Sequence, residues 1–512
     1  MRKLIMISLL LAGFGSVTAA EVSREQAVEM AKSRVSGTVS SVEAVSYERQ
    51  TVYYIVQFAE GGWVLVSADD TTMPVIGYSN EGVYQTEDQP DNVRSVMDGY
   101  AQQIVDNKLT ARQRHTGWET GDVARARQTR ATEKIEPLIK VNWNQTGAYK
   151  KYCPGTGSNQ AIVGCVAVGM AQAMSVAQWP PRPVGDYGYT SQNYGSLYIN
   201  YDKEPDYNWS DILSGANGKD DVARLLWHCG VSVNMNYGTD GSGTQDSYIA
   251  SALKRNFQYP QSVKYYSRSG YEGADDEWKE LILNELRGGR AVAYSGSDPK
   301  GYGHCFNLDG YDGEFFHVNW GWGGSNNGYF PLNGLKDATM GYTYTDGQSV
   351  IVGIRPPSEK PSDITLSSTQ VQAGQPAGTY VCDVVVESEA TNPVYTYTLK
   401  GTYNPITHTT ATPPFKIEDD KLYTTKVLDA GKNQKVTIIA KNTKNGGSVE
   451  RTFNIKVTAD PTGVTEICVE TVGPRQYFSA SGVQLPVPGK GLNIIRQRMS
   501  DGTTKTVKVF NK

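Results

Sequence analysis

Cys165 is the residue whose surroundings in the sequence are best suited to nucleophilic chemistry. A glycine-containing loop, CPGTGSNQAIVG, precedes it, and the small, apolar segment that it opens, CVAVGMAQAM, is expected to be helical. A thiol at a helix N-terminus meets the positive end of the helix dipole and free N–H groups, which stabilise a thiolate and can receive an oxyanion. Because a single cysteine is more commonly a buried apolar residue, the local pattern leaves both interpretations open.

His304 is the strongest candidate for a base that would serve this thiol. It lies in GYGHCFNLDGY, where glycines lead into a predicted strand, and Gly303 leaves room for an extended substrate backbone. A tight turn at Asp312–Gly313 would return the chain as a neighbouring strand, which brings Asn319 and Trp320 within reach of the imidazole. The alternative is a core histidine with satisfied hydrogen bonds. The five histidines of the chain are His115, His228, His304, His317 and His408.

Other classes of chemistry lack their signatures in this sequence. There is no HExxH, no paired CxxC and no cluster with metal-ligand spacing, so no metal is expected. The G-x-S-x-G elbow of serine hydrolases and the glycine-rich loops that bind nucleotides are also missing, so no organic cofactor is expected. The net charge of −4 carries no long run of one sign, which argues against nucleic acid as a partner.

The N-terminal residues 1–20 have the pattern of a secretory signal peptide. Arg2 and Lys3 precede an apolar run from Leu4 to Phe14, and small residues up to Ala20 suit signal-peptidase cleavage. This run is shorter than the roughly 20 apolar residues of a membrane-spanning helix, and no later segment qualifies. We therefore expect a secreted or cell-surface protein without a membrane span.

A basic segment divides the remaining chain before its largest unit. Residues 21–107 mix predicted helices, over 24–35 and 92–107, with strands over 52–58 and 63–67. Residues 108–134 are polar, and with few apolar side chains to bury they predict an exposed linker that is open to proteolysis. A tether that is never cut is the alternative. The linker arginines are Arg112, Arg114, Arg125, Arg127 and Arg130.

The rest of the chain predicts an α+β unit followed by β-rich units. Residues 135–356 contain predicted helices over 164–176 and 277–286, and then strands over 291–295, 304–309 and 315–320. Residues 357–461 alternate as an all-β sandwich that resembles cadherin-like or bacterial immunoglobulin-like domains. Residues 462–512 form a small β unit, similar to the C-terminal sorting domains of Bacteroidetes secreted proteins, which would make a secretion machinery a partner.

Several segments in the same order resemble the streptopain family of papain-like cysteine peptidases, from residue 1 to about 356. They include GGWVLVSADDTTMPVIGYSNEGVY, WNQTGAYKKYCP, GCVAVGMAQAM, VSVNMNYGTDGSGT and GHCFNLDGYDGEFFHVNWGWGGSNNGYF. The resemblance implies a papain-like fold, Cys165 as nucleophile and His304 as general base. It further implies that Gln145 lends an oxyanion donor and that Trp320 holds the imidazole, with Asn319 as the rival for that task.

The resemblance predicts a secreted cysteine endopeptidase made as a zymogen, which acts on proteins or peptides while residues 21–107 inhibit it. The glycine- and serine-rich loop 236–244, with Gly241, Ser242 and Gly243, would border the cleft with Gly303. Cys305 stands where the family commonly has alanine, and strand alternation predicts that it packs away from the cleft. A transpeptidase or amidase with the same pair, or an exported adhesin with an inactive papain-like unit, are the alternatives.

Overall fold

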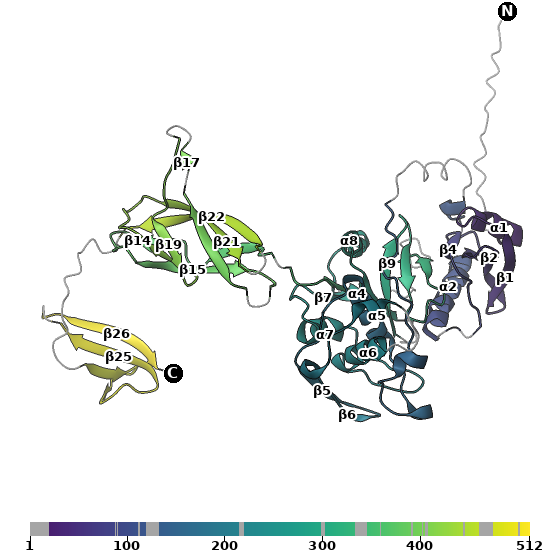
Figure 1. The fold of residues 1–512 in the computed structure, drawn as a ribbon, viewed down its shortest axis with the longest axis horizontal. Coiled ribbons are helices and arrows are strands. Elements are labelled where there is room, and N and C mark those ends of the chain that lie inside the picture. Colours follow the sequence, from purple (N-terminus) through teal and green to yellow (C-terminus); the bar gives the residue numbers. More distant parts are fainter. Residues whose placement is uncertain are drawn as a thin grey trace, which may run out of the picture. The chain divides into compact units, whose positions relative to one another are not determined.

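The structure is a computed structural model that consists of two compact units, residues 1–358 and 359–512, each with its own hydrophobic core (Figure 1). The predicted signal segment before Ala20 and most of the predicted linker lie outside the described residues. The structure describes residues 20–87, 89, 91–110, 113–118, 133–214, 220–297, 303–332, 346–358, 360–390, 393–401, 403–404, 408–443, 446–459, 475–499 and 502–511.

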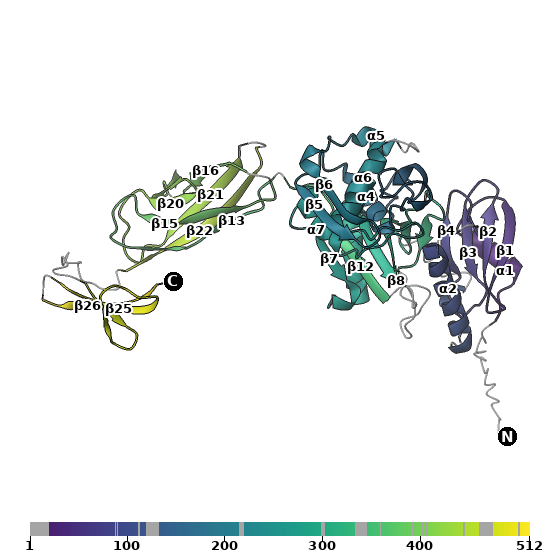
Figure 2. The same cartoon turned by 90° about the horizontal axis from the view of Figure 1, so that it is seen from below.

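The N-terminal part of the first unit is a four-stranded sheet between two helices. Its first helix begins at a capping box, in which the Ser23 side chain accepts from the N–H of Gln26 and the Gln26 side chain accepts from the N–H of Ser23. Alternate strand residues pack against α1 on one face and α2 on the other (Figure 2). The elements are α1 (Arg24–Lys32), β1 (Val39–Tyr47), β2 (Gln50–Phe58), β3 (Trp63–Ser67), β4 (Val75–Ser79) and α2 (Asp91–Thr110).

This sheet continues directly into the sheet of the following segment. A pairing between Tyr78 of β4 and Tyr329 of β11 joins the two halves into ten strands, in the order β1-β2-β3-β4-β11-β10-β9-β8-β12-β7. The strands of the N-terminal segment therefore belong to the same sheet as those of the following segment. The strands of the second half are β7 (Lys264–Ser267), β8 (Val292–Ser297), β9 (Gly303–Tyr311), β10 (Phe316–Asn319), β11 (Gly328–Phe330) and β12 (Asp346–Val352).

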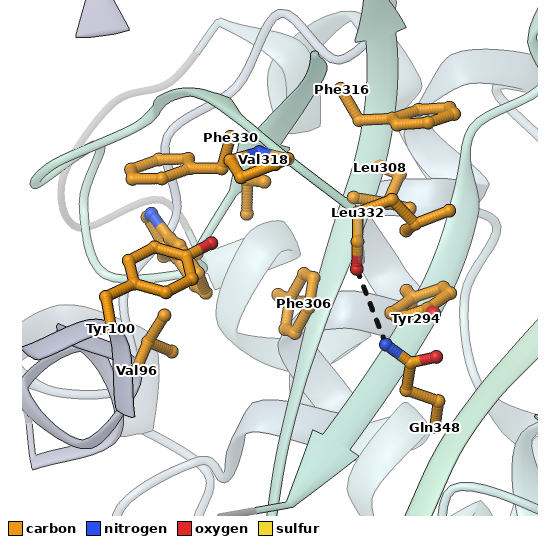
Figure 3. Close-up of a pocket in the computed structure, with 12 residues that line it drawn as sticks. Val96, Tyr100, Tyr294, Phe306, Leu308, Phe316, Val318, Phe330, Leu332 and Gln348 are labelled. Carbon is orange, nitrogen blue, oxygen red and sulfur yellow. Dashed lines mark hydrogen bonds between the residues drawn. The ribbon is translucent and has the colours of Figure 1, made fainter. Parts of the chain in front are cut away.

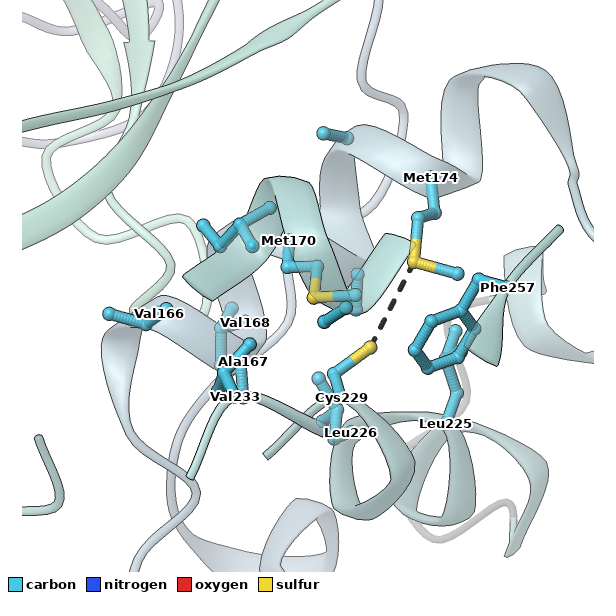
Figure 4. Close-up of a cluster of buried hydrophobic side chains, with 14 of the residues drawn as sticks. Val166, Ala167, Val168, Met170, Met174, Leu225, Leu226, Cys229, Val233 and Phe257 are labelled. Carbon is cyan, nitrogen blue, oxygen red and sulfur yellow. Dashed lines mark hydrogen bonds between the residues drawn. The ribbon is translucent and has the colours of Figure 1, made fainter. Parts of the chain in front are cut away.

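Helices cover the second half of the sheet and enclose the largest core. Met170 and Met174 of α4 pack there against Leu226 and Cys229 of α6 and against Phe257, all of them fully buried (Figure 4). Burial of each such side chain contributes about 1.5–3 kcal/mol. The helices around this core are α4 (Cys165–Ala177), α5 (Trp209–Leu213), α6 (Asp220–Ser232) and α7 (Tyr248–Asn256). Helix α8 (Asp275–Arg287) packs into a second core that also contains residues of α2. Between α4 and α5 in the chain, β5 (Asp186–Ser191) and β6 (Gly195–Asn200) form an antiparallel hairpin.

The second unit contains two four-stranded sheets that share one core, followed by a separate four-stranded sheet. Buried Val384 and Leu422 of the first sheet belong to the same cluster as Ile438 and Ile455 of the second. The first sheet is β13 (Asp363–Leu366), β15 (Tyr380–Glu387), β20 (Lys421–Thr424) and β19 (Phe415–Glu418). The second is β14 (Gln370–Gln372), β22 (Ser448–Thr458), β21 (Gln434–Asn442) and β16 (Tyr395–Lys400). The last sheet is β24 (Gln484–Leu485), β23 (Gln476–Ser479), β25 (Gly491–Arg498) and β26 (Thr504–Asn511).

The helices and strands predicted around the candidate site are confirmed. The helix predicted over 164–176 is α4, and the strands predicted over 304–309 and 315–320 are β9 and β10. The α+β class of the first unit is confirmed as well. Among the residues that the structure describes, no helix has the length and hydropathy to cross a bilayer.

Candidate active site

Cys165 is the first residue of α4, and the geometry of the preceding glycine places it there. Gly164 has φ of +93°, a conformation that side chains disfavour. A Cβ on Gly164 would also lie 2.7 Å from the Met235 side chain and 2.9 Å from the carbonyl oxygen of Ser242. A residue other than glycine would therefore shift the start of the helix. The turn presents the cysteine at the helix end that carries free N–H groups.

The Cys165 thiol is protonated in this arrangement. Burial raises its pKa above the ordinary value, and the negative charge of Asp246 acts in the same direction. The backbone N–H groups of Cys305 and Val166 oppose this shift, because they would stabilise a thiolate. The N–H of Cys165 itself acts in the same direction, but burial outweighs these effects on the pKa.

His304 is buried and its ring is bound to the neighbouring strand. Its Nε2 lies 3.1 Å from the carbonyl oxygen of Trp320, so this nitrogen carries a proton and donates. The imidazole is nearly parallel to the Trp320 ring at 6.4 Å between centroids, and the Phe306 ring lies 5.9 Å away. Burial lowers the pKa of His304 to about 4, which keeps the ring neutral. A neutral histidine and a neutral thiol cannot form an ion pair.

The structure does not bring the Cys165 thiol and the His304 ring together. Among the described residues no hydrogen bond joins them. Cys305 is buried in the core, and its side chain faces α4, where a Cβ on Gly169 would lie 3.0 Å from its sulfur. Neighbouring side chains of β9 point to opposite faces of the sheet, as expected. Cys305 faces α4, and the ring of His304 lies on the other face, beside Phe306. Burial raises the pKa of Cys305, so it is a poor nucleophile.

The N-terminal segment covers the residues that hold His304. Val96 and Tyr100 of α2 line a small cavity of about 40 Å³ together with Phe306 and Trp320 (Figure 3). Figure 3 shows α2 on one side of this cavity and the strands of the second half of the sheet on the other. Helix α2 therefore lines the same cavity as Trp320, the ring that lies beside the imidazole.

The side-chain amide of Gln145 contains a buried N–H donor with no hydrogen-bond acceptor among the described residues. Its backbone oxygen accepts from the N–H of Val163 at 3.0 Å, which ties it to the segment that leads into Cys165. Its side chain is buried, and within the described residues its Nε2 has no hydrogen-bond partner. The amide of Gln160, a possible substitute, already donates to the carbonyl oxygens of Lys150 and Lys151. A buried donor without a partner is costly unless a ligand uses it.

Asn319 belongs to a different network. Its Nδ2 donates to Val141 O at 3.1 Å, and its Oδ1 accepts from Gln172 Nε2 at 3.1 Å and from the N–H of Gly321. Gln172 in turn accepts from Asn307 Nδ2 at 3.1 Å. These buried amides join α4 to β9 and β10, while Trp320 contacts His304. Sequence analysis missed this network, although amide side chains inside apolar segments are a usable signal.

The predicted substrate loop lies beside the start of α4. Asn236 and Gly243 exchange backbone hydrogen bonds of 2.9 and 3.2 Å, which close the loop that contains Gly241. The Ser242 hydroxyl is buried and donates to Ile162 O at 2.7 Å, so it fastens the loop to the chain before Cys165. Gly303 is exposed at the beginning of β9, opposite Ser297.

Comparisons with known proteins agree with one another. Residues 143–330 match the peptidase C10 family, and residues 19–104 match the Spi protease inhibitor family. Streptopain from Streptococcus pyogenes is 32% identical over 340 residues, which cover 59% of this chain and 80% of that protein. The thiol protease/hemagglutinin PrtT from Porphyromonas gingivalis is 32% identical over 404 residues, 71% of this chain and 45% of that protein.

The fold of the first unit also has a solved counterpart. A fragment of prointerpain A from Prevotella intermedia superposes with a TM-score of 0.50 at 24% identity, over 62% of this chain and 99% of that chain. This likeness shows a shared fold, and the sequence matches to the catalytic and inhibitor segments show the kinship. The chain belongs to the peptidase C10 family, and it is a cysteine peptidase preceded by an inhibitor-like prosegment.

Proposed function

We propose that this chain is an exported cysteine endopeptidase, made as a zymogen, which cleaves protein or peptide bonds through an acyl-enzyme. The Cys165 thiolate attacks the scissile carbonyl carbon to form a thioester, and His304 gives a proton to the departing amine. Water, activated by the same imidazole, then hydrolyses the thioester. The Cys165 N–H and the Gln145 side chain stabilise the oxyanion, and Trp320 supports the imidazole.

The observation that carries this proposal is the unpartnered amide of Gln145 beside the segment that leads to Cys165. A buried Nε2 without an acceptor destabilises the resting protein by about 1–3 kcal/mol. An oxyanion formed at the helix N-terminus would supply the missing acceptor, so the donor strengthens its interaction in the transition state. No metal or organic cofactor takes part in this chemistry.

Activation consists of a movement of His304. In the precursor the imidazole donates to Trp320 O behind α2, and it must turn toward α4 to receive the thiol proton. The prosegment, residues 21–107, would be released by cleavage in the linker 108–134, after Arg127 or Arg130. Support for this boundary comes from Glu133, which pairs with Arg287 at 2.6 and 2.8 Å, and from Ile135, which pairs with Tyr311.

The remaining segments serve export in this proposal. Residues 1–20 would be a signal peptide that directs the chain to the cell surface or the medium. Residues 357–461, with two sheets around one core, would be an immunoglobulin- or cadherin-like sandwich. Residues 462–512 would be recognised by a secretion machinery.

Hydrolysis of casein with and without a thiol-alkylating reagent tests the proposed function. The activated protein should hydrolyse casein, and prior alkylation should abolish the activity with the label located on Cys165 by peptide mass spectrometry. Hydrolysis that survives complete labelling of Cys165, or no hydrolysis by the activated protein, would refute it.

A further inference from the structure

Asp246 is a carboxylate near the nucleophile that the proposed mechanism does not use. It follows the loop 236–244 and precedes α7, where its backbone oxygen accepts from the N–H of Ile249 at 2.9 Å. Its side chain is half-buried, and its Oδ2 accepts a hydrogen bond from the hydroxyl of buried Ser349. The position of the carboxylate is therefore fixed by β12.

The register of the sheet relates this carboxylate to the thiol. Ser349 of β12 pairs with Ser295 of β8, and Ser295 pairs with Cys305 of β9, so the three side chains share one face. Two strand spacings separate Ser349 from Cys305, which is about 10 Å. The Cys305 side chain faces α4, the helix that begins with Cys165, since a Cβ on Gly169 would lie 3.0 Å from its sulfur. The carboxylate of Asp246 is therefore bound on the side of the sheet that faces the nucleophile's helix. Its charge raises the pKa of both thiols, which agrees with this placement.

The carboxylate has no cation to balance it. Among the described residues Asp246 forms no ion pair, and its Oδ1 receives no hydrogen bond. Two other shielded carboxylates of the same unit are paired with a cation: Asp70 with Arg114 at 3.4 Å, and Glu285 with Arg290 at 2.7 Å. Removing an unpaired charge from water is costly, and a cationic ligand would offset that cost.

We propose that Asp246 is a specificity-determining residue that binds an arginine or lysine side chain of the substrate close to the scissile bond. This inference rests on the proposed function, because it assigns a substrate class to that site. The chain itself contains such a substrate: the segment that maturation must cut, residues 108–134, includes five arginines. An enzyme with this preference could process its own linker.

A purely structural role is the competing explanation, since the bond from Ser349 alone could hold the start of α7. The two roles differ in their response to charge. Asp246→Asn keeps an oxygen that can accept from Ser349 but removes the negative charge, so it changes selectivity only if the charge binds substrate. Asp276→Asn removes the same charge from α8 and is the matched control.

The test compares peptide pairs in which one residue is either arginine or its neutral isostere citrulline, scanned over four positions on each side of the scissile bond. Full-length protein, activated with trypsin that is then inhibited, should hydrolyse the arginine peptide with a kcat/KM roughly fivefold higher at the responsive position, the upper end of what an exposed ion pair contributes. Asp246→Asn should bring this ratio close to one, Asp246→Lys should favour glutamate there, and Asp276→Asn should keep the wild-type ratio.

The outcomes separate the inference from the function on which it rests. Equal rates for both peptides of every pair, or a ratio that persists in Asp246→Asn, would overturn the inference and leave the peptidase assignment standing. Failure of the activated wild-type protein to hydrolyse either peptide of any pair would overturn the proposed function and the inference together.

Discussion

His304 donates from Nε2 to the carbonyl oxygen of Trp320 at 3.1 Å, and this bond holds the imidazole away from the Cys165 thiol. Both groups are neutral there, since burial lowers the pKa of the histidine and raises that of the cysteine. The same Trp320 lines the cavity under α2 of the prosegment. In the proposed mechanism, the His304 ring leaves Trp320 and turns toward Cys165 when α2 is removed.

Thiol reactivity should increase on activation. In the precursor the Cys165 thiol is half-buried and its pKa is raised, so iodoacetamide at pH 7 should label it at least about tenfold more slowly than in the activated enzyme. Labelling rates measured by mass spectrometry of the Cys165 peptide check this. Equal rates in precursor and activated enzyme would show that the prosegment does not separate the pair.

Loss of the oxyanion donor should reduce turnover without disabling the thiol. Gln145→Ala is expected to lower kcat by roughly 10²–10³-fold, the usual size for one such donor, while alkylation of Cys165 stays fast. Gln160→Ala is the matched control, because its amide is occupied by backbone carbonyl oxygens. Near-normal turnover in Gln145→Ala would assign the oxyanion to backbone donors alone.

Substitution of Trp320 should lower kcat, whereas substitution of Asn319 should lower stability. Trp320→Phe keeps most of the packing but loses the bond from Nε1 to Asn326 O, so the imidazole should be held less well and kcat should fall. Asn319→Ala leaves buried partners of its network unpaired, which should cost about 1–3 kcal/mol of stability. Its kcat at a temperature where it is folded should stay close to the wild-type value. A larger kcat defect in folded Asn319→Ala would reverse the two assignments.

Acidification should destabilise the precursor through His304. Its pKa is about 4 when folded against an ordinary value of 6.5, so an opened or unfolded chain binds the proton first as pH falls. Stability present above pH 6.5 is then lost toward pH 4, by up to about 3 kcal/mol at 1.4 kcal/mol per pKa unit. Burial also lowers the pKa of His228, which gives a pH dependence of the same sign. The contributions of the two histidines must therefore be measured separately.

Urea unfolding of the Cys165→Ala precursor between pH 7 and 4, with and without His304→Gln, isolates this contribution. The His304→Gln variant should show a weaker fall in unfolding free energy over this range. An identical pH dependence in both proteins would mean that His304 is not held neutral in the precursor.

The sequence predicted the elements of the site better than their contacts. The helix at Cys165, the strand at His304 and the turn at Asp312–Gly313 follow from local patterns, and the structure has them. The His304 ring lies beside Trp320, which lines a cavity together with α2, about 200 residues away in the chain, and no local pattern encodes that arrangement. The same holds for Asp246, whose partner Ser349 is 103 residues away.

The amide network shows the same limit. Gln172 bonds to Asn307 and Asn319 across 135 and 147 residues. The alternation of side chains along β9 could be predicted from the sequence. Packing against distant elements decides whether His304 or Cys305 faces α4, and the sequence pattern does not show this.

Peptide hydrolysis by two cysteine variants tests whether Cys165 is the nucleophile. Cys165→Ala and Cys305→Ala should be produced as full-length precursors, cleaved with trypsin, freed of trypsin activity and assayed on one fluorogenic peptide. We expect no activity above background for Cys165→Ala. We expect near wild-type activity for Cys305→Ala, because this side chain only packs against α4. Substantial hydrolysis by folded Cys165→Ala, or loss of activity in folded Cys305→Ala alone, would contradict the assignment of Cys165 as the nucleophile.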